Sequence, residues 1–413
     1  MPKSAKLGLL AVSVVVVLGL FVGANFHGVR AASDGPQEGA YRQINVYSEV
    51  LQHIQSDYVE EPNMGKVTHG ALRGLLESLD ADSSYLSPTD YKTWKETKPG
   101  KAQVGINISK RFGYATVVSV VPGSPADKAN IADGDILEAI NGKDTRDISL
   151  AMVQLMMAGA PGSELKLAVL RPRSAKPDPV TLNRVVVVEP APTDTWYENN
   201  TILYLKPVVL DRDHVSYIES KLKAASKQPG KKVLLDLRDV AAGDVSEGVR
   251  LANFFLTSGT ITTLEGQKFE KQTTSAEASK AVNTKSPVVV LVNHGTAGAA
   301  EIAAAALADN KRADVVGSRT FGEGVQTKLF EMPDGSALLL SIAKYASPEG
   351  KKFEDDGVTP ATVVENTNPD DDDDEDDTAT KTSAPATATA AKKRPKMVDD
   401  QLTKALEMLK AKA

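Results

Sequence analysis

The sequence predicts a mixed α/β protein in which smaller units precede and follow an α/β core. Between residues 195 and 365, apolar strand patterns alternate with helical patterns, which is typical of α/β cores. Within that region, Val288–Val292 is wholly apolar, as expected for a strand buried on both faces of a sheet. The chain has 413 residues, 41% of them hydrophobic. That length allows two or three domains of roughly 150 residues each.

The first 32 residues have the pattern of an export signal. Lys3 and Lys6 precede an apolar run from Leu7 to Ala24, which matches the charged and apolar regions of a signal peptide. Small residues around Val29–Ala31 allow cleavage, whereas a run of about 18 apolar residues also suits a membrane span. We expect either a removed signal peptide or an inner-membrane anchor formed by residues 7–24. In both cases the remaining chain is periplasmic or otherwise outside the cytoplasm.

Residues 33–99 are predicted to form a helical cap. Apolar side chains recur at helical spacing from Ile44 to Ile54 and again along Val67–Leu79. Pro62 and Asn63 mark a turn between the two helices.

Residues 100–188 are predicted to form a strand-rich unit. Dense turn signals such as Pro122–Pro125 separate its short apolar segments. The expected strands are Val104–Ile108, Ala115–Val121, Ile136–Ile140 and Leu165–Arg171. The segment Ser149–Ala158 is expected to be a helix, with Ser149 as its N-cap.

Residues 189–368 are predicted to form the α/β core. Its expected strands, besides Val288–Val292, are Ile202–Leu205 and Lys232–Leu237. Its expected helices are Val245–Leu256 and the alanine-rich Ala300–Ala308, which starts directly after a loop.

The last part of the chain changes in composition. All residues of Asp370–Asp377 are acidic, and a Thr/Ala-rich stretch follows, so residues 369–396 are predicted to be a disordered linker. Residues 397–413 are predicted to contain a helix over Val398–Lys412, because Leu402, Leu406 and Leu409 share one face.

Composition excludes several classes of function. The chain has no cysteine, which excludes disulfides, thiolate metal sites and cysteine nucleophiles. Its net charge is −6, with much of the acid in one block. Because no basic stripe is present, we do not expect a nucleic-acid partner.

Several ordered motifs are similar to those of one protein family. They are Asp57–Glu60, Leu79–Leu86, Pro122–Ala126, Gly134–Asp135, Asp236–Arg238, Asp334–Leu338 and Lys344–Gly350. Together they resemble the carboxyl-terminal processing, or tail-specific, serine proteases over Tyr41–Val364. One departure is Ala81-Asp82, where the family has Pro-His. The resemblance implies a ClpP/crotonase-like protease core with a helical cap and an inserted PDZ domain, and it implies no cofactor.

The catalytic residues of that family are missing here. In the family, a serine attacks the peptide carbonyl and a lysine of lowered pKa takes its proton. The serine motif aligns with Thr296–Glu301 and places Gly298 at the nucleophile, while the lysine motif places Glu323 at the base. The supporting glutamine of the family is matched by Gln326, one residue closer than usual.

The loop that forms the oxyanion hole is also altered. The family reads D-L-R-N-N-P-G-G there, and glycines let backbone N–H groups approach the developing negative charge. This chain has Ala242 and Gly243 at the two glycine positions, and it adds a carboxylate, Asp239. Because nucleophile, base and oxyanion loop have changed together, and such residues act as a unit, we expect no proteolysis.

Other residues of the region could substitute for the missing groups. Thr296 lies two positions before Gly298 and could serve as a nucleophile with a lysine or with Glu323. His294, Glu301 and Glu323 could suggest zinc, but Glu301 is also favoured in a first helical turn by the helix dipole. We therefore expect no metal.

The expected PDZ domain keeps the residues for peptide binding. A PDZ domain binds a C-terminal peptide as an added strand. The segment Val104-Gly105-Ile106 suits the carboxylate loop, Asn107 and Ile108 would line the added strand, and Val153 and Met157 would close the pocket. The alternative is that these apolar residues, Ile108 and Val153 above all, belong to the domain core.

Three functions are therefore compatible with the sequence. The first is a pseudoprotease of the bacterial cell envelope that binds the C-terminal peptides of envelope proteins. It would act as an adaptor or decoy, or as the partner of an active paralogue or of itself. The second is an active serine-type endopeptidase with a substituted site. The third is a structural envelope protein that uses its tail helix for assembly.

Overall fold

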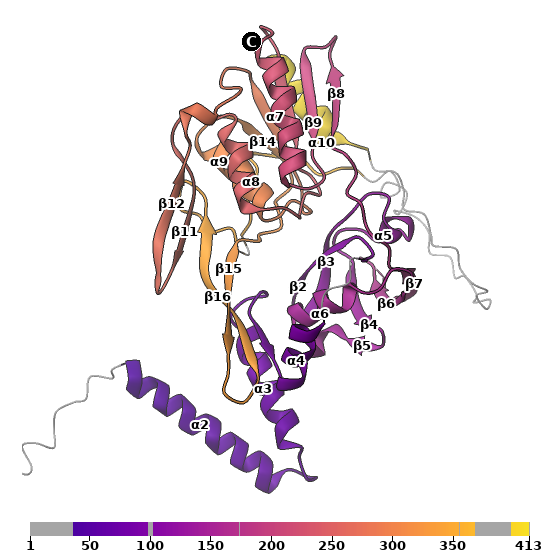
Figure 1. Cartoon of the computed structure of the whole chain (residues 1–413), viewed down its shortest axis with the longest axis vertical. Helices are drawn as coiled ribbons and strands as arrows, with labels where there is room; N and C mark the ends of the chain where they lie inside the picture. Colours follow the sequence, from indigo (N-terminus) through magenta and orange to yellow (C-terminus); the bar gives the residue numbers. More distant parts are fainter. Residues whose placement is uncertain (1–35, 98–101, 173, 355, 368–397, 413) are drawn as a thin grey trace, which may run out of the picture. The chain divides into compact units, whose positions relative to one another are not determined.

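The computed structural model describes residues 36–97, 102–172, 174–354, 356–367 and 398–412, with side chains from residue 41 onward (Figure 1). The predicted export signal and the predicted linker over 369–396 lie outside the described residues and stay predictions. None of the helices in the described part is both long and apolar enough to cross a membrane. The chain divides into two compact units, residues 1–69 and 70–413, and each is described by itself.

The first unit contains a long amphipathic helix. Helix α2 is Pro36–Asp57, and α3, Met64–Glu77, begins in this unit. The helical spacing predicted from Ile44 onward is thus confirmed. Many apolar side chains of α2 are exposed, among them Tyr41 at 67% and Ile44 at 60%.

The second unit begins with the rest of the cap. Strand β1, Ser84–Leu86, is buried and pairs antiparallel with a strand near the end of the core. Helix α4, Pro88–Glu96, starts where the Ser87 hydroxyl accepts a hydrogen bond from the Asp90 N–H and proline occupies the first turn. Both features favour a helix start.

The strand-rich unit forms one antiparallel sheet. Its strands run in the order β2-β3-β4-β6-β7, with β5 paired to β4. They are β2 (Ile106–Arg111), β3 (Tyr114–Val120), β4 (Ile136–Ile140), β5 (Lys143–Asp144), β6 (Glu164–Leu170) and β7 (Asp178–Asn183). The short helix α5, Pro125–Lys128, follows β3. Helix α6, Leu150–Met157, has the predicted N-cap, because the Ser149 hydroxyl accepts from the Met152 N–H.

The core is built on a six-stranded sheet with the order β17-β14-β13-β10-β9-β8. All neighbouring pairs are parallel except β8 with β9. The strands are β8 (Thr193–Tyr197), β9 (Ile202–Lys206), β10 (Lys232–Asp236), β13 (Val288–Val292), β14 (Asp314–Gly317) and β17 (Thr362–Val363). Every residue of β13 is buried, as predicted from its continuous apolar run.

Helices cover both faces of this sheet. Helices α7 (Arg212–Ser226), α8 (Val245–Asn253) and α9 (Ala299–Asp309) enclose the larger apolar cluster. On the other face, the C-terminal helix α10, Asp400–Ala411, packs Ala405 and Leu409 against β10, β13 and β14 (Figure 1). The predicted tail helix is therefore part of the core.

A second sheet extends from the core. Its order is β1-β16-β11-β12, with β15 paired to β16. The strands are β11 (Thr260–Gly266), β12 (Phe269–Ser275), β15 (Val325–Glu331) and β16 (Ala337–Ala346). Strand β16 joins the cap to the core, because it pairs with β1 and with β11.

Several predicted boundaries differ from the structure, and one helix was missed. The segment Val104–Ile108 becomes strand only at Ile106, because Gly105 has a φ of 82° that breaks the extended pattern. Helix α8 ends at Asn253 instead of Leu256, since the Asn253 amide donates to the Leu256 carbonyl and turns the chain. Helix α7 was not identified from the sequence.

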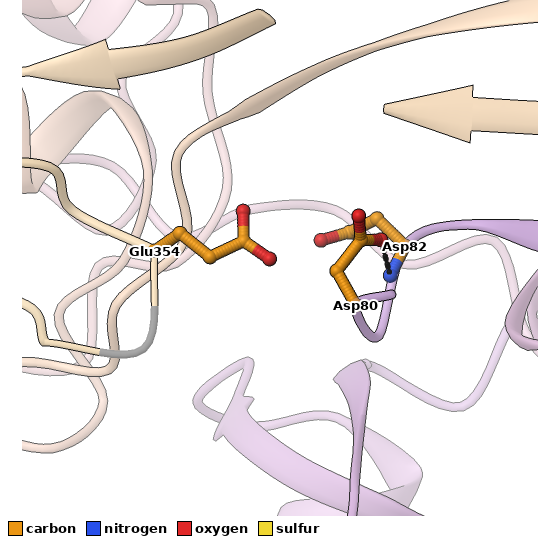
Figure 2. A group of neighbouring side chains, drawn as sticks. All are labelled: Asp80, Asp82 and Glu354. Atoms are coloured by element: carbon orange, nitrogen blue, oxygen red, sulfur yellow. Dashed lines mark hydrogen bonds between the residues drawn. The ribbon is translucent and has the colours of Figure 1, made fainter. Parts of the chain in front are cut away.

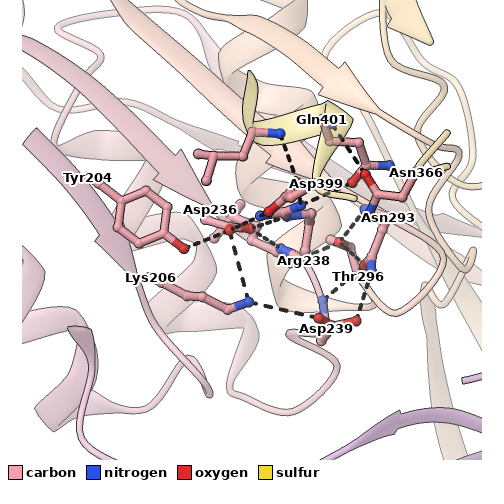
Figure 3. Close-up of polar contacts among 12 residues, drawn as sticks. Tyr204, Lys206, Asp236, Arg238, Asp239, Asn293, Thr296, Asn366, Asp399 and Gln401 are labelled. Atoms are coloured by element: carbon pink, nitrogen blue, oxygen red, sulfur yellow. Dashed lines mark hydrogen bonds and ion pairs between the residues drawn. The ribbon is translucent and has the colours of Figure 1, made fainter. Parts of the chain in front are cut away.

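A buried ion network joins α10 to the central strand. Arg238 follows β10 and donates to both oxygens of the fully buried Asp236 and to Asp399, the N-cap of α10 (Figure 3). Burial alone would raise the pKa of Asp236, but the nearby cations Lys206 and Arg238 outweigh it and lower that pKa. The network therefore keeps a buried carboxylate ionised and fixes the chain on both sides of it.

The packing of α10 leads to a stability prediction. Replacing the fully buried Leu409 by alanine should lower the free energy of unfolding by about 2–5 kcal/mol, because it removes apolar contacts and leaves a cavity. Urea denaturation followed by circular dichroism measures the change. Leu75→Ala, at a helical leucine that is 54% exposed, is the matched control and should cost much less. An equal effect of both variants would show that α10 does not pack as described.

Candidate functional site

Gly298 lies at the turn between β13 and α9. It is the N-cap of α9, with φ 55° and ψ −114°. These angles match the first central residue of a II′ turn, a position dominated by glycine. Sharp strand-to-helix turns of this kind are where many hydrolases expose a nucleophile. The backbone at position 298 therefore keeps a conformation suited to a nucleophile, although glycine supplies none.

The space around Gly298 is open toward Glu323. A Cβ atom built on Gly298 would meet only one heavy atom within 4 Å, the Glu323 Oε2 at 3.9 Å. The two positions that the sequence analysis assigned to nucleophile and base are therefore brought together. A carboxylate faces the place where the family has a serine hydroxyl.

Glu301 connects the turn at Gly298 with the segment that carries Glu323. Its carboxylate is fully buried and accepts hydrogen bonds from the N–H groups of Gly298 (2.9 Å), Gly322 (2.8 Å) and Glu323 (2.8 Å). The Thr320 hydroxyl also donates to it. Burial raises the pKa of Glu301 to about 7, although these four donors act in the opposite direction. Glu301 is thus a positioning residue and is not aimed at a ligand.

Glu323 lies in a strongly acidic environment. The residue is exposed, but the surrounding protein limits the hydration of its carboxyl group. This desolvation, together with the negative charges of Asp82, Glu301 and Glu354, raises the pKa of Glu323 to about 7. A lysine at this position would instead be attracted by the same charges and would hold its proton.

Two of these acids, Asp82 and Glu354, meet Asp80 where cap and core join within the second unit. Asp80, Asp82 and Glu354 each offer a carboxylate oxygen, and the three oxygens lie within 4.8 Å of one another (Figure 2). Their donor chemistry suits a hard cation such as Ca²⁺. However, Asp80 already accepts from the Asp82 and Ser83 N–H groups, and Lys344 lies 3.8 Å from Glu354. The sequence analysis missed this group, because its members are distant in the chain.

The other residues of the region that were named from the sequence differ in their exposure. The Thr296 hydroxyl is fully buried, donates to the Leu237 carbonyl at 2.8 Å and accepts from the Asn293 N–H. His294 is exposed at the end of β13 and is not a member of the acidic group. Gln326 is exposed on β15.

The loop after β10 holds its additional carboxylate against Asn293. Asp239 has a left-handed φ of 66°, and it exchanges two hydrogen bonds with Asn293 (Figure 3). The Ala242 carbonyl accepts from the Leu210 N–H at 3.0 Å. Gly243 packs so closely on Leu210 that a Cβ would lie 2.6 Å from its carbonyl oxygen. This loop is thus fixed by contacts of its own.

The strand-rich unit contacts the loop that carries Glu323. The Arg111 guanidinium, at the end of β2, donates to the Phe321 carbonyl and lies 4.3 Å from the centre of the Phe321 ring. The sequence analysis did not single out either residue. Arg111 and Phe321 are far apart in the sequence, so their contact in the folded protein could not be predicted from it.

The residues predicted to bind peptides lie at one edge of the strand-rich unit. Val104, Ile106, Val153 and Met157 are buried in its core cluster, with Ile108 partly buried beside them. Asn107 donates to the Ser119 hydroxyl on β3. Gly105 is required by packing, because a Cβ there would lie 2.3 Å from the Ser124 Cβ. Their role in peptide binding stays a prediction.

Family models match both the α/β core and the strand-rich unit. Residues 203–364 match the family model described as peptidase family S41, and residues 116–171 match a PDZ domain. The carboxyl-terminal-processing protease of Picosynechococcus sp. is 33% identical over 71% of this chain and 72% of that protein. The corresponding protease of Synechocystis sp. is 30% identical over 76% of this chain and 74% of that protein.

Further relatives extend the same similarity. The carboxy-terminal processing protease CtpA of Bacillus subtilis is 29% identical over 88% of this chain and 78% of its own length. Among solved structures, the photosystem II D1 C-terminal processing protease superposes with a TM-score of 0.64 at 23% identity. That match covers 78% of this chain and 92% of the other, and it supports the fold alone.

The acidic environment of Glu323 predicts a pH dependence of stability. Its pKa in the folded protein, about 7, lies above its ordinary value of 4.5. The folded state therefore binds this proton more tightly than the unfolded chain. The contribution of the protonated Glu323 to the free energy of unfolding is fully present below about pH 4.5, and it is lost as the pH rises toward about 7.

Glu323→Gln should reduce this loss, because glutamine stays neutral. Urea denaturation at pH 5 and pH 8 measures the difference in unfolding free energy between the two values. That difference should be smaller in the variant than in the wild type. Glu349→Gln, at an exposed carboxylate outside the cluster, is the control. If both variants follow the wild-type profile, Glu323 is not part of a coupled acidic group.

Proposed function

The chain belongs to peptidase family S41, the carboxyl-terminal-processing proteases, and we propose that it is a member without peptidase activity that binds protein C-termini through its PDZ domain. Membership confirms the resemblance inferred from the sequence motifs. The mixed α/β core, the helical cap and the PDZ domain agree with the predicted fold class.

One observation is the main support for the proposed lack of peptidase activity. The position of the nucleophile has no side chain, and the nearest heavy atom that its Cβ would meet is a carboxylate oxygen. A serine protease that loses its nucleophile or base loses a factor of about 10⁶ in kcat. The buried hydrogen bonds of Thr296 argue against the alternative of a threonine nucleophile.

The charge around the site also opposes acyl transfer. Peptide cleavage by a serine protease builds negative charge on an oxyanion, which donors and cations stabilise. Here Glu323 is surrounded by Asp82, Glu301 and Glu354. Such a field raises the energy of an oxyanion.

The PDZ domain supports the binding function. Within the described residues, β3 is the one strand that pairs with β2, so the other edge of β2 has no strand partner. Helix α6 packs beside β2, and the partly buried Ile108 and Met156 lie at this junction. An open strand edge next to an apolar helix is how PDZ domains bind an extended C-terminus.

The proposal extends to location and partners. The charged and apolar pattern of the first 24 residues supports export and a membrane-tethered or periplasmic protein. Its clients would be the C-terminal tails of envelope proteins, with an active paralogue or a second copy as further partners. No observation on the described residues favours a purely structural role, and α10 packs on its own core.

A protease assay tests the loss of catalysis. Purified wild-type protein should not cleave casein above the background rate, because it has neither nucleophile nor base. Cleavage that is present in the wild type and absent in Glu323→Gln would overturn the proposal. Gly298→Ser/Glu323→Lys, which restores both family residues, is the companion variant. It should fold with lower stability, since a Cβ at position 298 meets no atom outside its chain neighbours closer than 3.9 Å but is strained by the positive φ.

A peptide-binding assay tests the PDZ function. Fluorescence anisotropy with a labelled peptide that ends in apolar residues and a free carboxylate should show saturable binding. Ile108→Asp should weaken it about tenfold or more, because it places a charge beside the open edge of β2. Val180→Asp is the matched control: this residue is also partly buried, but it lies on β7 at the other end of the sheet. Equal binding by a peptide with an amidated C-terminus would contradict recognition of C-termini.

A further inference from the structure

The turn between β2 and β3 presents a phenylalanine to solvent. Strand β2 ends at Arg111, which pairs with Tyr114 on β3, so Phe112 and Gly113 form a two-residue hairpin turn. Both residues have a positive φ, 52° for Phe112 and 82° for Gly113, as in a type I′ turn. The first position of this turn favours asparagine, aspartate or glycine. A bulky side chain there is rare, because it crowds the main chain.

A second turn of the same strand-rich unit carries the favoured residues. Strands β4 and β5 are joined by Asn141 and Gly142, since Ile140 pairs with Lys143. The φ values of Asn141 and Gly142, 50° and 78°, are close to those at the β2–β3 turn. Two turns of similar backbone geometry thus differ in their first residue. At the β2–β3 turn the chain carries a strain that asparagine would relieve.

Packing inside the protein does not explain the choice of phenylalanine at this turn. Phe112 is 97% exposed, whereas an aromatic side chain stabilises a protein mainly through the apolar area that it removes from water. A residue that strains the backbone and stays exposed is typical of a contact with another molecule. The question is then which molecule the β2–β3 turn can reach.

The turn lies at one end of the groove between β2 and α6. The carboxylate loop predicted at Val104–Ile106 lies at the other end, close to the end of α6, because the Gly159 N–H donates to the Ala102 carbonyl at 3.0 Å. Near the turn, the Lys110 ammonium donates to the Ile148 carbonyl at 2.9 Å, just before α6 begins. The groove therefore runs from the carboxylate loop to the β2–β3 turn.

A peptide held by its C-terminus at the carboxylate loop would reach Phe112 with a residue far from its end. Paired strands advance by the same distance, about 3.3 Å per residue. The six residues of β2, Ile106–Arg111, therefore face the last six residues of an added peptide. The seventh residue from the carboxylate lies beside the turn. Phe112 is thus placed just beyond the part of the peptide that β2 itself can pair with.

A pocket of about 300 Å³ adjoins the turn, between the hairpin and the cap residues that follow α3. Each polar side chain of its lining has a partner within the protein, whereas the apolar residues Leu79 and Phe112 are 59% and 97% exposed. The surface that a ligand would cover here is therefore apolar. The polar contacts are Glu77 with Lys110, Ser78 with the Leu75 carbonyl, Asp80 with the Ser83 N–H, and Arg111 with the Phe321 carbonyl.

We propose that Phe112 and Leu79 form an upstream subsite of the peptide groove, which binds an apolar or aromatic side chain at the sixth or seventh position from the C-terminus of the bound protein tail. The subsite rests on the proposed peptide binding by the PDZ domain and adds a second determinant of specificity to it. A side chain packed on the Phe112 ring would bury aromatic area that is now in water. Tails with the same last residues would then be distinguished by a residue further upstream.

Two ten-residue peptides with a free carboxylate test the subsite. They share the same apolar C-terminal end and differ only at the sixth and seventh positions from it, which are both phenylalanine or both serine. In fluorescence anisotropy on the full chain, the phenylalanine peptide should bind about three- to tenfold more tightly, as expected for one aromatic contact. Equal affinity of two peptides that both bind would overturn the subsite and leave the PDZ function intact. Absence of saturable binding by both peptides would contradict the proposed function itself.

The variant Phe112→Asn separates recognition from folding. Asparagine suits the positive φ of this turn, so the variant should unfold at a higher urea concentration than the wild type. It should also lose the preference for the phenylalanine peptide. A loss of preference in a more stable protein does not come from misfolding. If Phe112→Asn keeps the preference, the proposal is wrong.

The matched control is Asn141→Phe, which makes the opposite change at the β4–β5 turn. This variant should unfold at a lower urea concentration, because it introduces the strain and removes the hydrogen bond from the Lys166 N–H to the Asn141 side chain. It should keep the preference for the phenylalanine peptide, since the β4–β5 turn is not part of the groove. Loss of the preference in the folded Asn141→Phe protein would place the determinant elsewhere and overturn the proposal.

Discussion

The buried carboxylate of Glu301 is the interaction on which the geometry of the site depends. It accepts hydrogen bonds from Gly298 on one segment and from Gly322 and Glu323 on another. Removing it would leave three backbone N–H groups without their partner inside the protein, and each such group costs about 1–3 kcal/mol. Glu301 thus fixes the relation between the two positions that define the chemistry of the family, whatever side chains those positions carry. The turn at Gly298 and the segment of Glu323 therefore stay together with glycine and glutamate at the two positions.

A second constraint acts from the opposite side of the sheet. Arg238 ties the end of β10 to the first turn of α10, and Asp239, the next residue, begins the altered loop. The loop is thus held between a buried ion network and Asn293. Its shape follows from these contacts.

Helices and strands with a strong local pattern in the sequence could be predicted from it. The continuous apolar run of β13, the hydroxyl cap at Ser149 and the leucine face of α10 were each predicted and are each present. The Gly298–Glu323 pairing was also accessible, because the family motifs place both residues. The acidic group of Asp80, Asp82 and Glu354 was not, since its members come from distant segments and meet only after β1 has paired with β16.

The backbone at Gly298 has a consequence for the stability of the fold. A serine in that conformation would bear strain of about 1–2 kcal/mol, because its side chain crowds the main chain when φ is positive. Glycine adopts the same conformation without that strain. A turn shaped to present a side chain is therefore more stable when it carries none.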